Sequence, residues 1–421
     1  GTEHYALKND GIVSGNLDID FTFAGETAAD FTGSSGNFQN IKVNASGADV
    51  NQVGAATFDG TLTVVANATY DAGNDGLTVT GATSVTGTLL CNASTVSLGS
   101  NVDDAYSVVV NASGTFTGGS GTHTLGAVNV SSSANNFTFS SGTTTINGRA
   151  TSGNSRRAFS TAATNKITAA GTLVIDQART PLSIRCDDTT GINNLTMNCG
   201  SGRVLHLDGD LTVGGTLNVS AGTVSTRNVG DSADNDLTVA GDASVTGTLT
   251  GNASAISLGS LTIESGGTYS ATSGTTTITS MTSTGSGDRS LNNKSGGTFT
   301  NNDGTVLFNS SSDQRMELAG TGNVHNLTLS KSDNDLVTFG NITVEGDLSI
   351  TLATTHTMRP NNASETLTVT GDVTIVEGKL GDVTNYTGAI SFGSLTVESG
   401  GTFIATSGTT TLSKESDTGG T

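Results

Sequence analysis

The sequence predicts an all-β protein folded as a parallel β-helix, or β-solenoid, in which the chain winds through about 19 stacked coils. Three observations lead to this prediction. Apolar and polar residues alternate in short runs, glycine-rich turns separate the runs, and long stretches of sequence recur in a fixed order. With 57 glycines, 33% hydrophobic residues and no tryptophan in 421 residues, the chain lacks material for one thick globular core but can fill a thin, long one.

Period-two alternation is the main secondary-structure signal. In a run such as Leu62-Thr63-Val64, a strand places both aliphatic residues inward and the threonine toward water. Turns such as Ser265-Gly266-Gly267 suit corners that need a positive φ. No window shows the 3.6-residue period of a helix. Runs of the same kind begin at Leu77, Leu211, Leu237, Leu261 and Leu395.

Two long segments are repeated. Residues 261–278, LTIESGGTYSATSGTTTI, match residues 395–412, LTVESGGTFIATSGTTTL, at 14 of 18 positions, and residues 108–125 are a weaker copy. Residues 77–100 match residues 237–260 at 17 of 24 positions. A third version of this second segment, residues 367–394, carries four extra residues.

A further landmark, an asparagine before an aliphatic residue, recurs at Asn40, Asn194 and Asn326. All landmarks come in one order, which predicts three tandem units near 1–152, 153–284 and 285–421 in one continuous solenoid. The two ends also match. Residues 408–421 match the stretch that starts at Gly274, and the residues from Gly1 onward resemble its continuation at 289–294. This match predicts a longer array, or subunits stacked head to tail.

The coil length follows from the spacing of the aliphatic runs. They recur at roughly 16–26 residues, the length of a β-helix coil with two or three strands. Antiparallel hairpins would favour frequent two-residue turns such as Asp59-Gly60, and these are few. An array of β-sandwich modules, each about 140 residues long, is the alternative fold.

The charge of the chain restricts its partners. Thirty-seven acidic residues outweigh 17 basic ones, for a net charge of −20. Such a polyanion gains nothing from a nucleic-acid backbone and is repelled by an anionic membrane surface. No segment reaches the roughly 18 apolar residues of a membrane span. We therefore expect no nucleic-acid binding and no membrane insertion.

Acidic turns suggest calcium as the one possible cofactor. The stretch 71–76 spaces oxygen ligands closely, and 231–236 and 361–365 are its counterparts, expected at one corner of the solenoid. The stretch 71–76 lacks the closing bidentate glutamate of a calcium loop, and turns formed by Asp and Asn are the alternative interpretation. The candidate ligands, all weak, are Asp71, Asp75, Asp231, Asp234 and Asp236.

Cysteine usage predicts core residues. Three cysteines are too few for a disulfide scaffold. Cys186 follows Ile184 by two and Cys199 follows Met197 by two, so both are expected to point inward. We expect small buried side chains; a Cys186–Cys199 bridge between neighbouring coils is the alternative.

No pattern predicts an enzyme. Arg185-Cys186-Asp187-Asp188 is the nearest candidate for a catalytic cluster, but the sequence places no partner beside it, and the pair 103–104 is equally isolated. The five histidines show no metal-ligand spacing. The threonine triplets, such as 275–277, recur about once per long unit, which indicates strands and not the regular rows of an ice-binding face.

A resemblance adds to this interpretation. The runs SGGTFTNNDGTVLFN (295–309), GNVHNLTLS (322–330) and GNITVEGDLSI (340–350) resemble repeats of very large bacterial surface adhesins and of fibre-like repeat proteins of marine bacteriophages. The resemblance implies a parallel β-helix, an extracellular or virion location, and a role in attachment or surface structure. It supplies no catalytic residues.

The sequence thus predicts an extracellular structural or adhesive fibre segment, a self-stacking rod on a cell surface or filament. Its expected partners are copies of itself placed end to end, and surface glycans as a further option. A bacteriophage tail fibre or virion appendage is one alternative. A carbohydrate-binding or carbohydrate-cleaving β-helix is the other.

Overall fold

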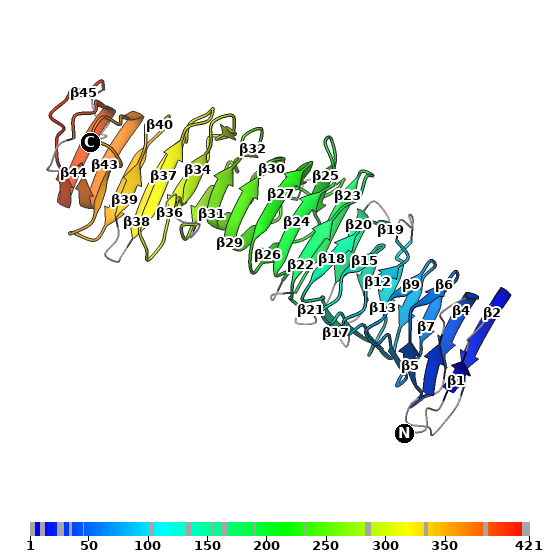
Figure 1. The fold of residues 1–421 in the computed structure, drawn as a ribbon. Coiled ribbons are helices and arrows are strands. Elements are labelled where there is room, and N and C mark those ends of the chain that lie inside the picture. The colour runs from blue at the N-terminus through cyan, green and yellow to red at the C-terminus, as the bar shows by residue number, and fades with distance from the viewer. Residues whose placement is uncertain are drawn as a thin grey trace. The chain divides into compact units, whose positions relative to one another are not determined.

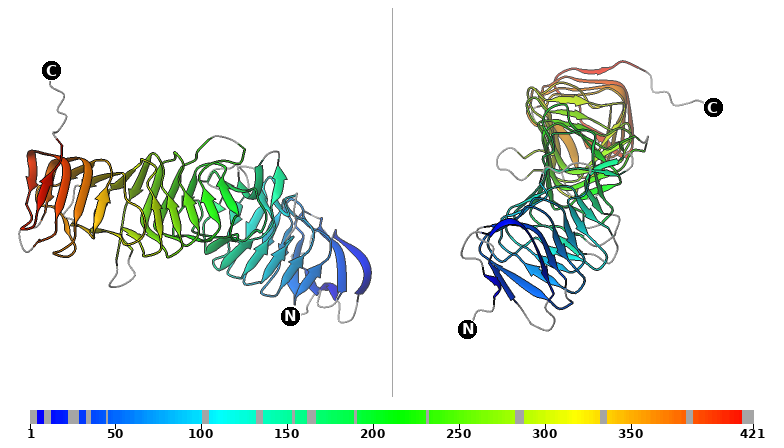
Figure 2. Two further views of the ribbon diagram at one scale, coloured as in Figure 1. Left: turned by 90° about the horizontal axis from the view of Figure 1, so that it is seen from above. Right: turned by 90° about the vertical axis from the view of Figure 1, so that its right-hand side faces the viewer.

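The structure is a computed structural model (Figures 1 and 2). It describes residues 5–8, 13–22, 29–32, 36–44, 46–100, 105–131, 136–152, 155–161, 167–188, 191–230, 233–282, 288–331, 336–381 and 386–414. These residues form β-strands and no helix, so none of them belongs to a helix that could cross a membrane. The strands build a parallel β-solenoid of about 16 turns, which confirms the predicted fold.

The chain divides into two compact units. The first contains residues 1–215 and 228–233, and the second contains residues 216–227 and 234–421. In each unit, strands from successive coils lie side by side in parallel and form three ladders (Figures 1 and 2). This parallel pairing rules out the β-sandwich alternative, whose sheets are antiparallel.

The first unit holds β1–β26. Its first ladder comprises β1 (Tyr5–Lys8), β3 (Ala29–Thr32), β5 (Asp49–Val53), β8 (Thr69–Asp71), β11 (Thr88–Leu90), β14 (Thr115–Thr117), β17 (Asn136–Thr138) and β21 (Ile167–Thr168). β2 (Val13–Phe21) and β4 (Gly36–Val43) enter both other ladders. The second ladder continues with β6 (Ala56–Phe58), β9 (Leu77–Val79), β12 (Val96–Leu98), β15 (His123–Leu125), β18 (Thr143–Ile146), β22 (Thr172–Ile175) and β24 (Asn194–Asn198).

The third ladder of this unit continues with β7 (Leu62–Val64), β10 (Thr83–Val85), β13 (Val108–Val110), β16 (Val128–Val130), β20 (Ser155–Thr161), β23 (Leu182–Cys186) and β25 (Val204–Leu207). β19 (Ala150–Ser152) forms an antiparallel hairpin with β20. β26 (Leu211–Val213) pairs with Ile192 through a single parallel bridge.

The second unit holds β27–β45, and we name its ladders after one inward residue each. The Leu261 ladder contains β27 (Leu217–Ala221), parts of β29 (Leu237–Val245) and β31 (Ile256–Ile263), β34 (Leu291–Asn293), β37 (Gln314–Leu318), β39 (Val337–Phe339), β42 (Thr357–Pro360), and the ends of β43 (Leu367–Leu380) and β44 (Ile390–Phe403). The Thr276 ladder contains the other parts of β29 and β31, β33 (Thr275–Ile278), β36 (Thr305–Phe308), β38 (Asn326–Lys331), β41 (Leu348–Leu352), and the middle of β43 and β44.

The Tyr269 ladder completes the second unit. It contains β28 (Thr223–Ser225), β30 (Thr248–Thr250), β32 (Thr268–Ser270), β35 (Thr298–Thr300), β40 (Ile342–Val344), the starts of β43 and β44, and β45 (Thr410–Leu412).

Inward residues are stacked in register, which forms the core. In the Thr276 ladder, one continuous inward row runs Leu237, Ile256, Thr276, Val306, Leu327, Leu348, Val373 and Leu395. The predicted Leu-Thr-Val alternation is confirmed, because both aliphatic residues of β7, β9 and β26 are buried and the threonine between them is not. Stacked aromatic side chains, such as Phe116 and Phe137 at 4.7 Å between ring centroids, also fill the core.

The cysteines are core residues, as the alternation predicts. Cys91, Cys186 and Cys199 are buried and free, so the structure contains no Cys186–Cys199 bridge. Burial raises the pKa of Cys186 to about 12 and that of Cys199 to about 11, so both thiols stay protonated at neutral pH.

The coils vary in length more than the spacing of the aliphatic runs predicts. Leu237 pairs with Ile256, 19 positions later, whereas Leu261 pairs with Leu291, 30 positions later. Longer coils carry residues outside the strands, such as 279–282 and 288–290 in the described part of the chain. The coil number is therefore about 16, close to the 19 expected from a uniform coil of roughly 22 residues.

Repeated sequences in the second unit do not return to the same ladder. Residues 261–278 pass through the Leu261, Tyr269 and Thr276 ladders in that order. In the copy at 395–412, Leu395 belongs to the Thr276 ladder, Phe403 to the Leu261 ladder and Thr410 to the Tyr269 ladder. The intervening chain is thus not a whole number of coils, and each copy is displaced by one ladder.

Glycines form columns where the backbone turns between strands. In the first unit, a Cβ added to Gly81 would meet the Gly60 carbonyl, one added to Gly99 would approach that of Gly81, and one added to Gly126 would collide with that of Gly99. Neighbouring coils lie only about 4.8 Å apart, so a column of residues without side chains is what fits this corner.

The close packing of the glycines at this corner leads to a prediction about thermal stability. We expect Gly126→Ala to lower the melting temperature by several degrees, because the new methyl overlaps the Gly99 carbonyl and the Ser107 hydroxyl. Gly76→Ala is the matched control. There the nearest atoms lie 3.8 and 3.9 Å from the added Cβ, so the melting temperature should stay within about 2 °C of the parent protein. Equal shifts for both variants in thermal unfolding followed by circular dichroism would contradict the steric explanation.

The buried His123 predicts a pH dependence. Its imidazole occupies an inward position of β15, edge-on to Phe116, and burial lowers its pKa to about 4. Between pH 6.5 and 4 the unfolded chain binds a proton that the folded chain does not. The free energy of unfolding should therefore fall as the pH drops through this range, by on the order of 3 kcal/mol. Denaturant midpoints at pH 7 and pH 4.5 measure the loss. His123→Leu should reduce it, whereas His206→Gln, at a half-buried position, should not.

Candidate functional sites: a polar groove and the outermost coils

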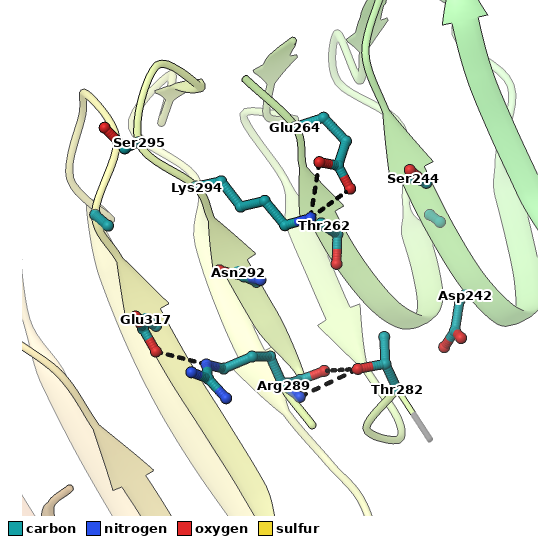
Figure 3. A pocket seen from close by; sticks show the side chains of 12 residues that line it. Asp242, Ser244, Thr262, Glu264, Thr282, Arg289, Asn292, Lys294, Ser295 and Glu317 are labelled. Carbon is teal, nitrogen blue, oxygen red and sulfur yellow. Dashed lines mark hydrogen bonds and ion pairs between the residues drawn. The ribbon is translucent and has the colours of Figure 1, made fainter. Parts of the chain in front are cut away.

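A polar groove lies on the outer surface of the Leu261 ladder in the second unit (Figure 3). Its floor is a row of outward residues from successive coils, Ser244, Thr262, Asn292 and Glu317, which the parallel pairing holds side by side. The groove has a volume of about 570 Å³, within the range of small-molecule sites. Ladder pairing alone therefore assembles a surface from residues up to 73 positions apart.

Ion pairs line the groove on both sides. Lys294 Nζ lies 2.8 Å from both carboxylate oxygens of Glu264, one coil away. Arg289 Nε donates to Glu317 Oε2 at 2.5 Å, and Arg315 Nη2 lies 3.4 Å from the same oxygen. Two carboxylates thus pair with three cations, so the groove offers paired charges and hydrogen-bonding groups.

A repeated contact fixes one wall of the groove. The Ser260 hydroxyl donates to Asp242 Oδ1 at 2.7 Å. In the matching segment of the sequence, the Ser394 hydroxyl donates to Asp372 Oδ1 at 2.8 Å. The Asp–Ser pair thus belongs to the repeat and holds neighbouring coils together, so Asp242 is already engaged where it meets the groove.

An acidic hollow lies in the first unit, around the sequence cluster Arg185-Cys186-Asp187-Asp188. Asp187 and Asp188 line it together with Asp210 of the next coil, and its volume is about 320 Å³. Arg185 Nη2 lies 2.7 Å from Asp187 Oδ2, and Asp188 Oδ2 accepts the backbone N–H of Ile167 at 2.8 Å. The structure thus supplies the neighbour, Asp210, that the sequence did not place. The pair 103–104 lies outside the described residues.

The hydrogen bond to Asp187 also affects the guanidinium. It raises the pKa of Arg185 above its ordinary value, and burial opposes the change. Arg157, in the coil before Arg185, reaches Asp208 in the coil after it, and its Nη2 lies 2.6 Å from Asp208 Oδ2. Two of the acidic residues in this region are therefore held by arginines.

The calcium candidates of the first unit bind backbone and amide groups. Asp71 Oδ1 accepts the N–H of Gly73 at 2.7 Å and the side-chain amide of Asn92 at 2.6 Å. Asp75 Oδ2 accepts the N–H of Gly54 at 2.9 Å. These are the local bonds of the alternative interpretation, in which acidic residues shape turns.

The candidates of the second unit are similarly engaged. Asp234 Oδ1 accepts Arg227 Nε at 3.0 Å, and Asp236 Oδ1 accepts the N–H of Ala255 at 2.9 Å; Asp231 lies outside the described residues. The described part of the chain contains no group of three His, Cys, Asp or Glu side chains arranged for a metal ion. Calcium binding stays a prediction.

One expectation about these turns is wrong. Residues 234–236 lead into the Thr276 ladder at Leu237, whereas their counterparts at 361–365 lead into the Tyr269 ladder at Leu367. The displacement of the repeats by one ladder places these two turns at different corners. Equivalence in sequence therefore does not bring these oxygen ligands together.

The outermost coil of the second unit exposes apolar side chains. Val397 is 43% exposed and Leu412 is 56% exposed. Their counterparts in the matching internal segment, Ile263 and Ile278, are fully buried beneath the next coil. The run at Leu395 therefore has the predicted alternation of inward aliphatic residues. Among the described residues, however, no further strand covers these side chains.

The first unit exposes apolar side chains at its outermost coil as well. A hollow of about 450 Å³ is lined by Leu7, Leu17, Ile19 and Phe21, among others. Leu17 is 39% exposed. β1 and β2, which carry these residues, pair on one side with β3 and β4.

Comparison of the chain with protein-family models, with curated proteins and with solved structures finds no match. The sites are therefore interpreted from their geometry alone. Sequence reasoning missed the polar groove, because its residues come from separate coils. The sequence could have indicated the Glu264–Lys294 pair only through the separation of the two residues by one coil. Recognising that separation requires the pairing register, which the structure provides.

Proposed function

We propose that this chain is a segment of an extracellular structural or adhesive fibre that extends by end-to-end stacking of copies. The observation that supports this proposal is the internal coil-on-coil contact, in which the coil at 291–308 covers the coil at 261–278 in register and buries Ile263 and Ile278 completely. A solenoid coil presents unpaired backbone groups and apolar side chains on its open side, and another coil satisfies both.

Composition supports the extracellular setting. A net charge of −20 keeps long assemblies soluble and limits non-specific adhesion. The resemblance of the repeats to those of very large bacterial adhesins favours a cell-surface location, with a virion appendage as the alternative location for the same fibre. In either setting the structural role belongs to the ladders and requires no catalytic group.

Stacking predicts concentration-dependent assembly that one apolar contact controls. We expect the purified chain to form filaments in negative-stain electron microscopy and larger species in sedimentation velocity as the protein concentration rises. Leu412→Asp should suppress both, because it places a charge in the buried joint. Thr351→Asp, the same charge change at an exposed position of β41, is the control and should assemble like the parent chain. A chain that stays monomeric at high concentration, with and without Ca²⁺, would exclude the stacking function.

Glycan binding is a second candidate, favoured by the polar groove. Its floor and walls present hydroxyl, amide and charged groups that match the hydroxyl groups of sugars. If the groove binds glycans, a glycan array should retain the chain, and Asn292→Ala should weaken retention several-fold. Ser349→Ala, an outward position of β41, should leave retention unchanged. No retained glycan at high protein concentration would remove this candidate.

A further inference from the structure

We propose that the outer surface of the Tyr269 ladder is an ice-binding face. Its ligand is the crystalline surface of ice, and two parallel rows of hydroxyl-bearing side chains form the contact. This inference goes beyond the structural role proposed above and does not depend on it. It follows from the register of four successive coils inside the second unit.

Each of these coils contributes one three-residue strand with the same alternation. The middle residue of β28, β30, β32 and β35 is buried in the core, so strand geometry directs its two neighbours outward. The first outward residue is threonine in all four strands, and the second is serine or threonine. The first row comprises Thr223, Thr248, Thr268 and Thr298, and the second comprises Ser225, Thr250, Ser270 and Thr300.

Parallel pairing aligns the two rows without a register shift. Thr268 pairs with Thr248 on one side and with Thr298 on the other, and the second row is aligned in the same way. Successive coils lie about 4.8 Å apart, and residues two positions apart along a parallel strand are separated by about 6.6 Å. The hydroxyl groups therefore form a lattice with two nearly perpendicular repeats. Water molecules on a prism face of ice repeat at perpendicular spacings of similar size, so several hydroxyls can bind one crystal surface at once.

The hydroxyl groups of this face are available to a ligand. In the described part of the chain, no side-chain hydroxyl of the first row forms a hydrogen bond. In the second row, Ser225 Oγ accepts Asn252 Nδ2 at 3.2 Å, and Ser270 Oγ accepts Asn302 Nδ2 at 2.9 Å. Each asparagine lies at the corner of the next coil, so these bonds hold the serine oxygens in place. Neither serine hydroxyl donates its proton to another described residue, so both can donate to water of the crystal.

The edge of the face is kept clear by a glycine column. A glycine precedes the threonine of the first row in all four coils, at Gly222, Gly247, Gly267 and Gly297. A Cβ added to Gly247 would collide with the Gly222 carbonyl, and one added to Gly267 would collide with the Val245 carbonyl. The close packing of coils thus requires glycine at these positions, and no side chain from this column stands between the rows and a flat solid.

The composition of the face favours ice over a soluble ligand. Small-molecule sites are concave and rich in aromatic side chains. The two rows contain no charged and no aromatic residue, because Tyr269 and Phe299 point into the core, where their ring centroids lie 5.5 Å apart. This stacked core holds the rows in place before binding, which limits the entropy lost on contact with a crystal.

The threonine triplets of the sequence do not build this face. The middle residue of one triplet, Thr276, is buried, and the outward Thr277 pairs with Leu307 of the next coil. The first ladder of the first unit has comparable rows, but Asp71 and Leu90 interrupt one of them. The Tyr269 ladder has both rows complete in four successive coils, a pattern that appears only when the pairing register is known.

Inhibition of ice recrystallisation tests the face. The full-length chain is added to a film of small ice crystals held just below the melting point, and the lowest concentration that stops crystal growth is measured. We expect the parent chain to stop growth at a concentration at which an unrelated protein of similar net charge has no effect. Thr268→Tyr should raise this concentration at least tenfold, because the ring holds the crystal away from the neighbouring hydroxyls.

Thr277→Tyr is the matched control. It makes the same change in the same coil but on the outer surface of the Thr276 ladder, and tyrosine is a good strand residue at both positions. This variant should inhibit like the parent chain, whereas Thr250→Tyr, in the second row, should repeat the loss. Melting temperatures from circular dichroism check that all three variants are folded. A parent chain without inhibition, or equal inhibition by the Thr268→Tyr and Thr277→Tyr variants, would overturn the proposal.

Discussion

The hydrogen bond between one coil and the next is the interaction on which the rest of this structure depends. Thr69 N–H donates to the Ala48 carbonyl, Thr88 N–H to that of Ala68, and Thr115 N–H to that of Gly87, at 2.8 Å each. These bonds join residues 20 to 28 positions apart, and bonds of this kind fix the register of one coil on the next. Inward side chains must then stack on inward side chains, so a narrow core forms although only 33% of the residues are hydrophobic.

The same short spacing between coils determines which residues occupy the corners. A side chain at Gly81 or Gly126 would enter the carbonyl of the coil below, so these corners consist of glycine columns. Asparagine side chains are used where the backbone needs an additional hydrogen-bond acceptor. The Oδ1 atoms of Asn40 and Asn326 accept N–H groups that the ladders leave unpaired at a bend. The composition of the chain, rich in Gly and Asn, thus follows from its pairing geometry.

Much of the fold could be predicted from the sequence, because a solenoid repeats its local pattern. The alternation around Leu62 and Leu77, the inward position of Cys186 and the parallel stacking all appear in the residues themselves. The surface sites could not be predicted in this way. The groove joins Glu264 to Lys294 and Arg289 to Glu317, and the acidic hollow joins Asp187 to Asp210. These neighbours depend on the length of each coil, which varies with its loops and leaves no periodic signal.

The landmark asparagines and the repeated segments show that residues equivalent in sequence are not always equivalent in their position in the fold. Asn40 and Asn326 perform the same task, so the repeat is real at the level of single hydrogen bonds. Yet Leu261 and its counterpart Leu395 lie in different ladders, because the chain between them is a fractional number of coils. Two residues that are equivalent in the alignment therefore face different directions.

This displacement has a consequence for any surface that the repeat carries. In an array that keeps the same fractional coil number, corresponding patches would follow a spiral around the fibre axis, in place of a straight row along one side. Three repeats would bring a patch back to its starting azimuth. Such an array would have no preferred side, because the same patch would recur at three azimuths around its axis.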